Sequence, residues 1–245
     1  SGKATRNAAG VNTGIQFVLA QYNPAGELMD EPGINRVTVE EVTEGTPPDK
    51  YHRFLSQNNA IWPHEKYLNI WLMSETKYPK FWNSITKLCV PKYRLGSETL
   101  PGLSLPPVPS TWVPKVEQIG ILFRMSTFQY FQRSIDATAE RELVTCIGNY
   151  LGLLDTWKIN NSNVNDQCND TFAYGIVNNN GSLGTNSSWS KEVGSYRFLS
   201  ENIMDDPTGT HRSVSKDQAL RMYWVLKNCA GRSMWQSDFA LTGKE

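Results

Sequence analysis

Apolar residues recur along the chain in several short runs and in one longer helical pattern. The short runs predict four strands, at residues 14–20, 34–42, 67–73 and 118–124. Between Thr138 and Gly152 the apolar side chains return every three or four residues, which is the spacing of one helix face. Gly152 is placed to end that helix, because glycine adopts the left-handed cap conformation at little steric cost.

The pattern also predicts three more helices, one of them inserted over residues 76–95, a loop over residues 96–115 and one longer irregular stretch. A helix that would back the sheet is predicted to end near residues 58–59. A closing helix is predicted over roughly residues 215–227, with Ser213 or Ser215 as its N-terminal cap. Residues 158–201 are dominated by Asn, Ser and Gly and show little periodicity, which is typical of irregular structure.

These elements predict an α+β chain in three parts. Residues 1–13 are small and polar and are expected to form a flexible leader. Residues 14–152 would form an N-terminal subdomain of strands and helices. Residues 153–245 would form a C-terminal subdomain that is irregular until its closing helix, with a hinge just after Gly152.

The composition narrows the classes of partner. The chain has 245 residues, and 24 basic and 24 acidic residues give it a formal net charge of zero. Without a basic excess, neither a nucleic acid nor an anionic membrane surface is an expected partner. No apolar run is long enough to span a bilayer, so no transmembrane segment is expected.

Cysteine and histidine spacing excludes the common local metal motifs. The four cysteines form no C-x-x-C pair, so neither a zinc knuckle nor a thioredoxin-like motif is indicated. A disulfide between Cys168 and Cys229 and free thiols both stay open. The three histidines, His52, His64 and His211, lie far apart in the sequence and form no local cluster.

One segment carries a family resemblance. Residues 143–157 are similar to the zinc helix of pappalysin-like metzincins, whose pattern is H-E-x-G-H-x-x-G-L-x-H. Gly148 and Gly152 match the two glycines of that pattern, and Leu153 matches its leucine. Further matches to the family follow one another in order from about residue 14 to residue 228, at residues 31–36, 67–71, 166–171, 202–205 and 218–222.

This resemblance implies a metzincin-like (zincin) fold. Such a fold has a twisted mixed sheet with a backing helix and an active-site helix. An irregular C-terminal subdomain then carries a Met-turn, here at Met204, and a closing helix. The family is typically secreted or lipid-anchored in bacteria, which implies an extracytoplasmic location and a possible lipid anchor outside these residues.

The residues that should bind zinc are changed. Thr145, Asn149 and Asp155 stand at the three ligand positions, and Cys146 stands where the family has the glutamate that polarises the attacking water. Threonine and asparagine are poor zinc ligands beside histidine, cysteine or carboxylate, which leaves Asp155 as the only plausible ligand. A catalytic zinc needs about three protein ligands. We therefore expect no zinc, no other cofactor and no catalytic residue.

The main hypothesis is a catalytically inactive metallopeptidase homologue, or pseudopeptidase. It would act as an extracytoplasmic binding protein that holds an extended peptide or a protein in the former active-site cleft. The first alternative is an active metalloendopeptidase with atypical ligands, such as Asp155 with the distant His211. A cysteine hydrolase built on Cys146 and a carbohydrate or surface-adhesion protein with exposed tryptophans are further alternatives.

Overall fold

The structure is a computed structural model that describes residues 10–38, 55–73, 120–124, 138–159, 164–176, 178–179, 182–183, 189–228 and 232–236. Its named elements, in chain order, are β1 (Ile70–Met73), β2 (Ile121–Arg124), α3 (Thr138–Tyr150), β3 (Trp157–Ile159), β4 (Tyr174–Ile176), β5 (Asn178–Asn179), β6 (Ser182–Leu183), β7 (Ser190–Val193), β8 (Tyr196–Leu199), α4 (Lys216–Asn228) and the 3₁₀-helix η3 (Ser233–Gln236).

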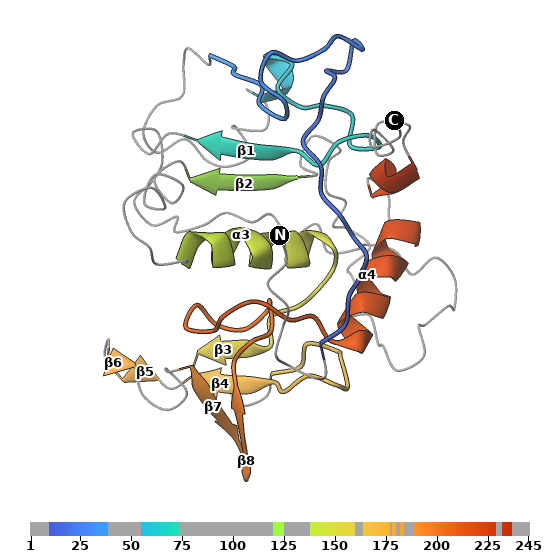
Figure 1. Ribbon diagram of the computed structural model, residues 1–245. Coiled ribbons are helices and arrows are strands. Elements are labelled where there is room, and N and C mark those ends of the chain that lie inside the picture. The colour runs from blue at the N-terminus through green and yellow to red at the C-terminus, as the bar shows by residue number, and fades with distance from the viewer. Residues whose placement is uncertain are drawn as a thin grey trace, which may run out of the picture.

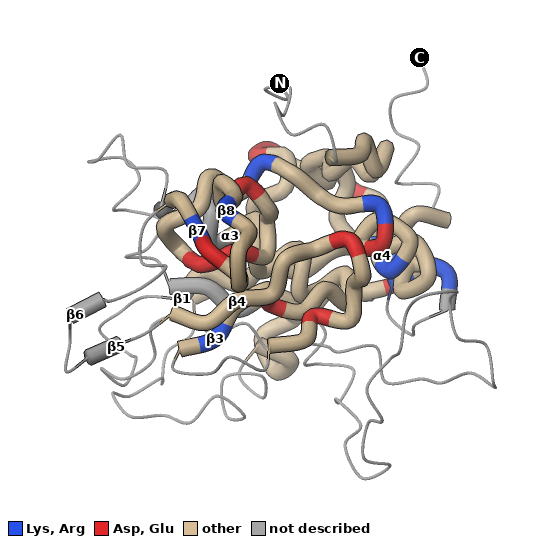
Figure 2. The backbone as a smooth tube through the Cα atoms, turned by 90° about the horizontal axis from the view of Figure 1, so that it is seen from below, with Lys and Arg blue, Asp and Glu red and all other residues tan. Residues whose placement is uncertain are grey.

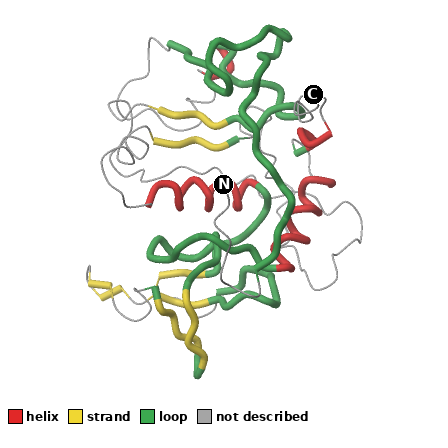
Figure 3. The backbone as a smooth tube through the Cα atoms, viewed as in Figure 1, coloured by secondary structure: helices red, strands yellow, loops and turns green. Residues whose placement is uncertain are grey.

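Helix α3 separates two groups of strands. The parallel pair β1–β2 lies on one side of α3, and the parallel pair β3–β4 lies on the other side with the antiparallel hairpin β7–β8 (Figure 1). The α4 helix lies at the side of both groups (Figure 3). Helices and strands are both present, as predicted. The described strands, however, form four separate two-stranded sheets rather than one twisted mixed sheet.

Two of the four predicted strands are found, as β1 and β2. The strand predicted at residues 14–20 is wrong, because this segment is extended but belongs to no sheet. It runs across the direction of β1 and β2 (Figure 1), and its last residue, Ala20, accepts a hydrogen bond from Gly33 instead of from a strand. Residues 34–38 form no strand either, and residues 39–42 lie outside the described residues. The predicted helix over residues 76–95 and the loop over residues 96–115 also lie outside the described residues. An apolar pattern indicates that one side of a segment can be buried. A strand also needs a neighbouring strand to pair with, which the pattern does not reveal.

The end of α3 follows the prediction closely. Gly152 has a φ of 86°, in the left-handed region. The amide of Gly152 donates to the carbonyl of Asn149 at 2.9 Å, and the amide of Leu153 donates to the carbonyl of Gly148 at 2.9 Å. These two bonds form a Schellman motif, which reverses the chain at the helix end. The reversal brings the residues after Gly152 back alongside the helix they have just left.

Substitution of Gly152 is expected to destabilise the protein. Gly152→Ala should lower the free energy of unfolding by roughly 1–2 kcal/mol, because an L-residue is strained at this positive φ. Gly152→Asn should lose less, since asparagine tolerates the left-handed region better than alanine. Urea denaturation of the two variants and the wild type measures both effects, and equal stability of the alanine variant and the wild type would contradict the assigned conformation.

The α4 helix begins at a capping box. The amide of Gln218 donates to the hydroxyl of Ser215 at 3.2 Å, and the amide of Ser215 donates to the side-chain carbonyl of Gln218 at 3.0 Å. Of the two serines left open by the sequence, the structure therefore selects Ser215. Gln218 also exchanges two side-chain hydrogen bonds with Asn202, at 2.7 and 3.0 Å, which ties α4 to the turn at residues 202–206.

A hydrophobic core packs around α3 and includes residues of β2, of the turn at residues 202–206 and of α4. Met204 is completely buried beneath α3, where a Cβ added at Gly148 would lie 2.5 Å from its sulfur. The absence of a side chain at Gly148 therefore allows the turn at residues 202–206 to approach the helix closely. The buried members of this core are Ile121, Cys146, Tyr150, Leu151, Leu153, Ile203, Met204 and Met222.

The N-terminal residues lie against the C-terminal part of the chain. Part of the predicted leader contacts the C-terminal part of the chain, because the amide of Val11 donates to the carbonyl of Val214 at 2.9 Å. The three-part division of the chain itself stays a prediction.

Figure 2 shows basic and acidic positions close to one another around β7 and β8. Within the described ranges, no helix is long and apolar enough to cross a membrane.

Candidate functional site

The three predicted ligand positions gather around the end of α3. Thr145 and Asn149 are one helical turn apart and so lie on the same face of α3. Asp155 follows the chain reversal at Gly152 and reaches back to the helix, where its carboxyl accepts a hydrogen bond from the side chain of Asn149. The turn at residues 202–206 lies against the same helix, as the contact between Met204 and Gly148 shows.

Thr145 is held by protein groups on the opposite turn. Its hydroxyl donates to the carbonyl of Ile203 at 2.8 Å and lies 3.3 Å from Nδ1 of His211. The other ring nitrogen of His211, Nε2, lies 2.9 Å from the carbonyl of Asp206. Because a carbonyl only accepts, Nε2 carries a proton in this network, and Nδ1 faces the hydroxyl of Thr145. The hydroxyl is therefore occupied by protein partners.

Asn149 and Asp155 bind each other. Asn149 is buried, and its amide nitrogen donates to the carbonyl of Leu153 at 3.1 Å. Asp155 keeps part of its surface exposed, but the protein crowded around its carboxyl raises its pKa above the usual range. The hydrogen bond from Asn149 and the charge of Lys158 oppose that rise. The residues at the second and third ligand positions are thus hydrogen-bonded to each other.

The two cysteines of the described residues do not form a reactive centre. Cys146 is 4% exposed within the core, and both ring nitrogens of His211, the base that a Cys146 nucleophile would need, contact other groups. Cys168 is a free thiol in the structure, and Cys229, its predicted partner in a disulfide, lies outside the described residues. Burial, with the nearby Asp166 carboxylate, raises the pKa of Cys168 to about 12. A thiol with that pKa is a poor nucleophile at neutral pH.

Asp205 fixes the turn beneath α3. Its carboxyl accepts hydrogen bonds from the hydroxyl of Thr156 at 2.6 Å and from the hydroxyl of Ser200 at 2.8 Å. The amide of Asn202 adds a third bond at 3.0 Å. Burial raises the pKa of Asp205, and these donors oppose the rise without cancelling it. Asp205 therefore ties the turn at residues 202–206 to Thr156, which follows the chain reversal after α3, and to Ser200, which follows β8.

A buried ion pair lies next to this turn, and sequence reasoning missed it. The ammonium of Lys191 lies 2.5 Å from the carboxylate of Asp206, with side chains that are 0% and 1% exposed. The hydroxyl of Tyr174 donates to the same carboxylate at 2.6 Å, and Lys191 also donates to Thr208 at 2.7 Å. Burial would raise the pKa of Asp206, but the bonds from Lys191, Thr208 and Tyr174 together hold it below its usual range.

The pKa of Asp206 predicts a dependence of stability on pH. A carboxyl with a lowered native pKa contributes stability above its unfolded pKa of about 3.9, and loses that contribution as the pH falls through the native pKa. At pH 7, Asp206→Asn is expected to lower the free energy of unfolding by roughly 3 kcal/mol, because it removes the carboxylate that balances the buried charge of Lys191.

Urea denaturation at pH 7, 5 and 3 measures this difference. It should be largest at the two higher pH values and should shrink at the lowest one. Asp30→Asn, at an exposed position, is the control and should show no such trend. A difference that is constant over all three pH values would contradict the assigned charge of Asp206.

The donors at the end of α3 do not fit a zinc ion. Zinc in proteins is bound by cysteine, histidine and carboxylate groups, and of the three positions only Asp155 offers one of these. The polar atoms of Thr145 and Asn149 are turned to the backbone carbonyls of Ile203 and Leu153. Within the described part of the chain, no group of three or more His, Cys, Asp and Glu residues is arranged to hold a metal ion. No zinc-dependent step can be derived from these residues.

The arrangement of these elements resembles the fold of the metallopeptidase mirolysin. Two solved structures of the metallopeptidase mirolysin share it. The structure "Mirolysin in complex with compound 9" superposes with a TM-score of 0.60 and 18% identity, over 92% of this chain and 76% of that chain. Mature mirolysin from Tannerella forsythia, in complex with a cleaved peptide, superposes with a TM-score of 0.58 and 19% identity, over 97% of this chain and 80% of that chain.

Two comparisons of the sequence give no match. No family model matches it, and no curated protein sequence matches it. The likeness to mirolysin therefore establishes the fold, as a metallopeptidase-like fold, and carries no activity across to this chain.

Proposed function

We propose that this protein is a pseudopeptidase, a catalytically inactive homologue of the pappalysin-like metzincins. The observation that carries the proposal is that the former ligand positions are satisfied by the protein itself. Thr145 bonds to Ile203 and contacts His211, while Asn149 bonds to Leu153 and Asp155. A zinc ion would have to break these bonds and would gain only one suitable ligand in return.

The loss of the general base supports the same proposal. In the family pattern, a glutamate beside the first ligand polarises the attacking water. Here Cys146 stands at that position and packs in the core, 4% exposed. General-base catalysis alone is worth roughly 10²–10⁴-fold in rate. A chain that lacks both the metal ligands and this base retains the scaffold without its chemistry, and it needs no cofactor.

The retained role would be binding. The metallopeptidase fold holds peptides in a cleft, and one mirolysin structure is a complex with a cleaved peptide. In this chain the surface beside Asp155, at the position of the former active site, would accept an extended peptide or a protein segment without cutting it. We further propose an extracytoplasmic location, with the protein secreted or lipid-anchored at a bacterial cell surface, as the family resemblance implies.

Peptide cleavage in the presence and absence of a chelator tests this proposal. The wild-type protein, incubated with casein and gelatin, is expected to give no chelator-sensitive cleavage, while mirolysin assayed beside it serves as the positive control. Cleavage that a chelator abolishes and that Asp155→Ala also removes would establish the alternative, an active metalloendopeptidase with atypical ligands.

Peptide capture tests the binding role. A displayed library of random peptides should yield ligands for the wild-type protein, and these should bind more weakly to Asp155→Lys, which places a bulkier side chain of opposite charge on the surface at the former active site. Asp30→Lys makes the same charge change at an exposed position outside that surface and is the matched control. Equal binding to both variants would place the captured peptides elsewhere on the protein.

A further inference from the structure

The extended segment at residues 14–20 has a backbone that pairs with no strand. It crosses β1 and β2 and belongs to no sheet (Figure 1). Within the described part of the chain, the amides of residues 16–19 and the carbonyls of residues 15–18 make no hydrogen bond. An extended backbone with unpaired donors and acceptors is an edge on which another strand can form.

The protein holds this segment at its two ends. Before it, the carbonyl of Thr13 accepts a hydrogen bond from the hydroxyl of Tyr223 in α4. At its other end, the carbonyl of Ala20 accepts a hydrogen bond from the amide of Gly33 at 2.7 Å. The backbone between these two points is therefore fixed in place but is left without partners of its own.

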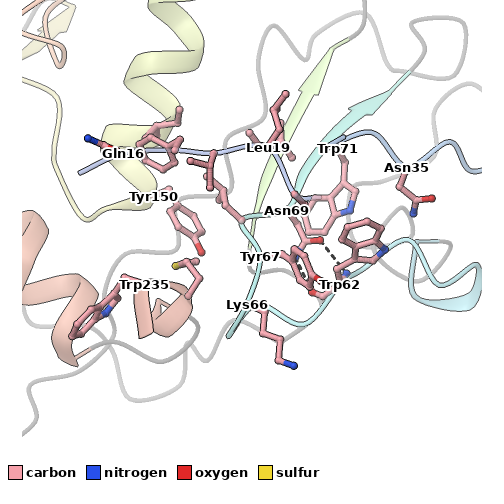
Figure 4. A pocket seen from close by; sticks show the side chains of 18 of the residues that line it. Gln16, Leu19, Asn35, Trp62, Lys66, Tyr67, Asn69, Trp71, Tyr150 and Trp235 are labelled. Carbon is pink, nitrogen blue, oxygen red and sulfur yellow. Dashed lines mark hydrogen bonds between the residues drawn. The ribbon is translucent and has the colours of Figure 1, made fainter. Parts of the chain in front are cut away.

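A cavity of about 1390 Å³ lies along the segment. Residues 14–22 form one wall of this cavity, while Tyr67, Trp71 and Tyr150 belong to its other walls (Figure 4). Because protein side chains do not fill this space, the middle of the segment is not packed tightly against the rest of the molecule. Its backbone edge thus stays accessible.

The side chains of the segment are apolar and exposed. Phe17, Val18 and Leu19 are 55%, 62% and 66% exposed, whereas Ile15 packs partly against the core. Successive side chains of an extended chain point to opposite faces, so Phe17 and Leu19 share one face and Val18 lies on the other. A group of exposed apolar side chains of this kind indicates a surface that meets another molecule.

The segment carries no charge that would keep two copies apart. No charged residue lies between Arg6 and Glu27. Like charges placed opposite each other destabilise a strand pair, and that penalty is absent here. Residues 15–19 are also free of proline and rich in β-branched, aromatic and aliphatic side chains, a composition that favours pairing with an identical segment.

We propose that two copies of this chain associate by antiparallel pairing of residues 15–19 about a two-fold axis at Phe17. Phe17 then lies opposite Phe17 of the partner subunit, and Leu19 lies opposite Ile15 of the partner subunit. Residues directly opposite each other share a face, so the apolar face of one copy meets the same face of the other. A shift by one residue would bring Gln16 onto that face.

This dimer does not depend on the proposed pseudopeptidase role. The second copy supplies the neighbouring strand that residues 14–20 lack in the single chain. A pairing over so few residues forms a small interface, so the association should be reversible, with monomer below about 1 µM and dimer near 100 µM.

Sedimentation of the full-length protein over this concentration range tests the association. Phe17→Lys places two lysines opposite each other and should weaken dimer formation by at least about ten-fold. Leu28→Lys makes the same charge change at a side chain that is 70% exposed and lies outside the pairing segment, so it should have no effect. Circular dichroism checks that both variants are folded.

Cysteine cross-linking tests the register. Phe17→Cys should form a disulfide-linked dimer on mild oxidation, because opposite Cα atoms of an antiparallel pair lie roughly 4.5–5.5 Å apart, within reach of a disulfide. Ala20→Cys should not, because each copy lies opposite residue 14 of the partner subunit, roughly 20 Å along the strand from its own counterpart. Wild-type protein, with its four native cysteines, gives the background.

Three results would overturn the proposal. Protein that stays monomeric up to about 100 µM would refute the association. Monomeric protein whose amides at residues 16–19 exchange slowly with solvent would show that the segment pairs within its own chain instead. A dimer that Phe17→Lys leaves unchanged, or that Ala20→Cys links as readily as Phe17→Cys, would place the interface elsewhere.

Discussion

Replacement of Lys191 by methionine is expected to lower the free energy of unfolding by roughly 3–5 kcal/mol, because it leaves a buried carboxylate without its counter-charge. Lys191 and Asp206 lie 2.5 Å apart with side chains that are 0% and 1% exposed. Tyr174 and Thr208 would still donate to Asp206, but neutral donors do not balance a buried charge. Urea denaturation at pH 7 measures the loss.

Removal of both charges tests whether the ion pair, and not only the packing of the Lys191 side chain, accounts for the loss of stability. Lys191→Met combined with Asp206→Leu should recover part of the lost stability, because an apolar pair leaves no unpaired charge. Lys216→Met, at an exposed position of α4, is the control and should change stability by no more than about 0.5 kcal/mol. If Lys191→Met proved as mild as that control, the buried ion pair would not exist as described.

Replacement of Arg221 by methionine is expected to have the second large effect, a loss of roughly 3 kcal/mol. Arg221 is 0% exposed in α4, and its Nε donates to the carbonyl of Gly152 at the reversal after α3. Its charge also lowers the pKa of the buried Asp166, against the larger effect of burial. The substitution would leave a buried carbonyl without this donor and a buried carboxyl without this cation.

A lysine at the same position is the informative control. Arg221→Lys keeps the charge but lacks the planar, forked donor set, so it should restore only part of the stability. Thermal and urea denaturation of both variants measure the difference. Full stability in the lysine variant would mean that the hydrogen bond to Gly152 contributes little, and that the positive charge alone matters.

The sequence predicted those elements that local chemistry determines. The α3 helix, its end at Gly152 and the capping box at Ser215 all depend on residues within a few positions of each other. The strand at residues 14–20 failed because strand pairing depends on a distant partner edge, which an apolar pattern cannot supply. The pair of Lys191 and Asp206 was missed for the same reason, since no local pattern brings two distant residues together.

In the candidate site too, local features could be predicted from the sequence and contacts between distant residues could not. The positions of Thr145, Asn149 and Asp155 at the end of α3 followed from the register of the glycines in a familiar pattern. The partners of these residues did not follow from it. His211 reaches Thr145 from a loop where its own φ is 49°, a left-handed conformation that the sequence around it does not announce. The contact between His211 and Thr145 could therefore be found only from the structure.

The zinc content of the purified protein tests the central claim most directly. The wild-type protein is equilibrated with zinc, freed of unbound metal and measured by elemental analysis, with mirolysin treated in the same way as a reference. We expect far less than one zinc per chain, because Thr145 and Asn149 offer no suitable ligand beside Asp155. About one firmly held zinc per chain, lost on substitution of Asp155 by alanine, would contradict it.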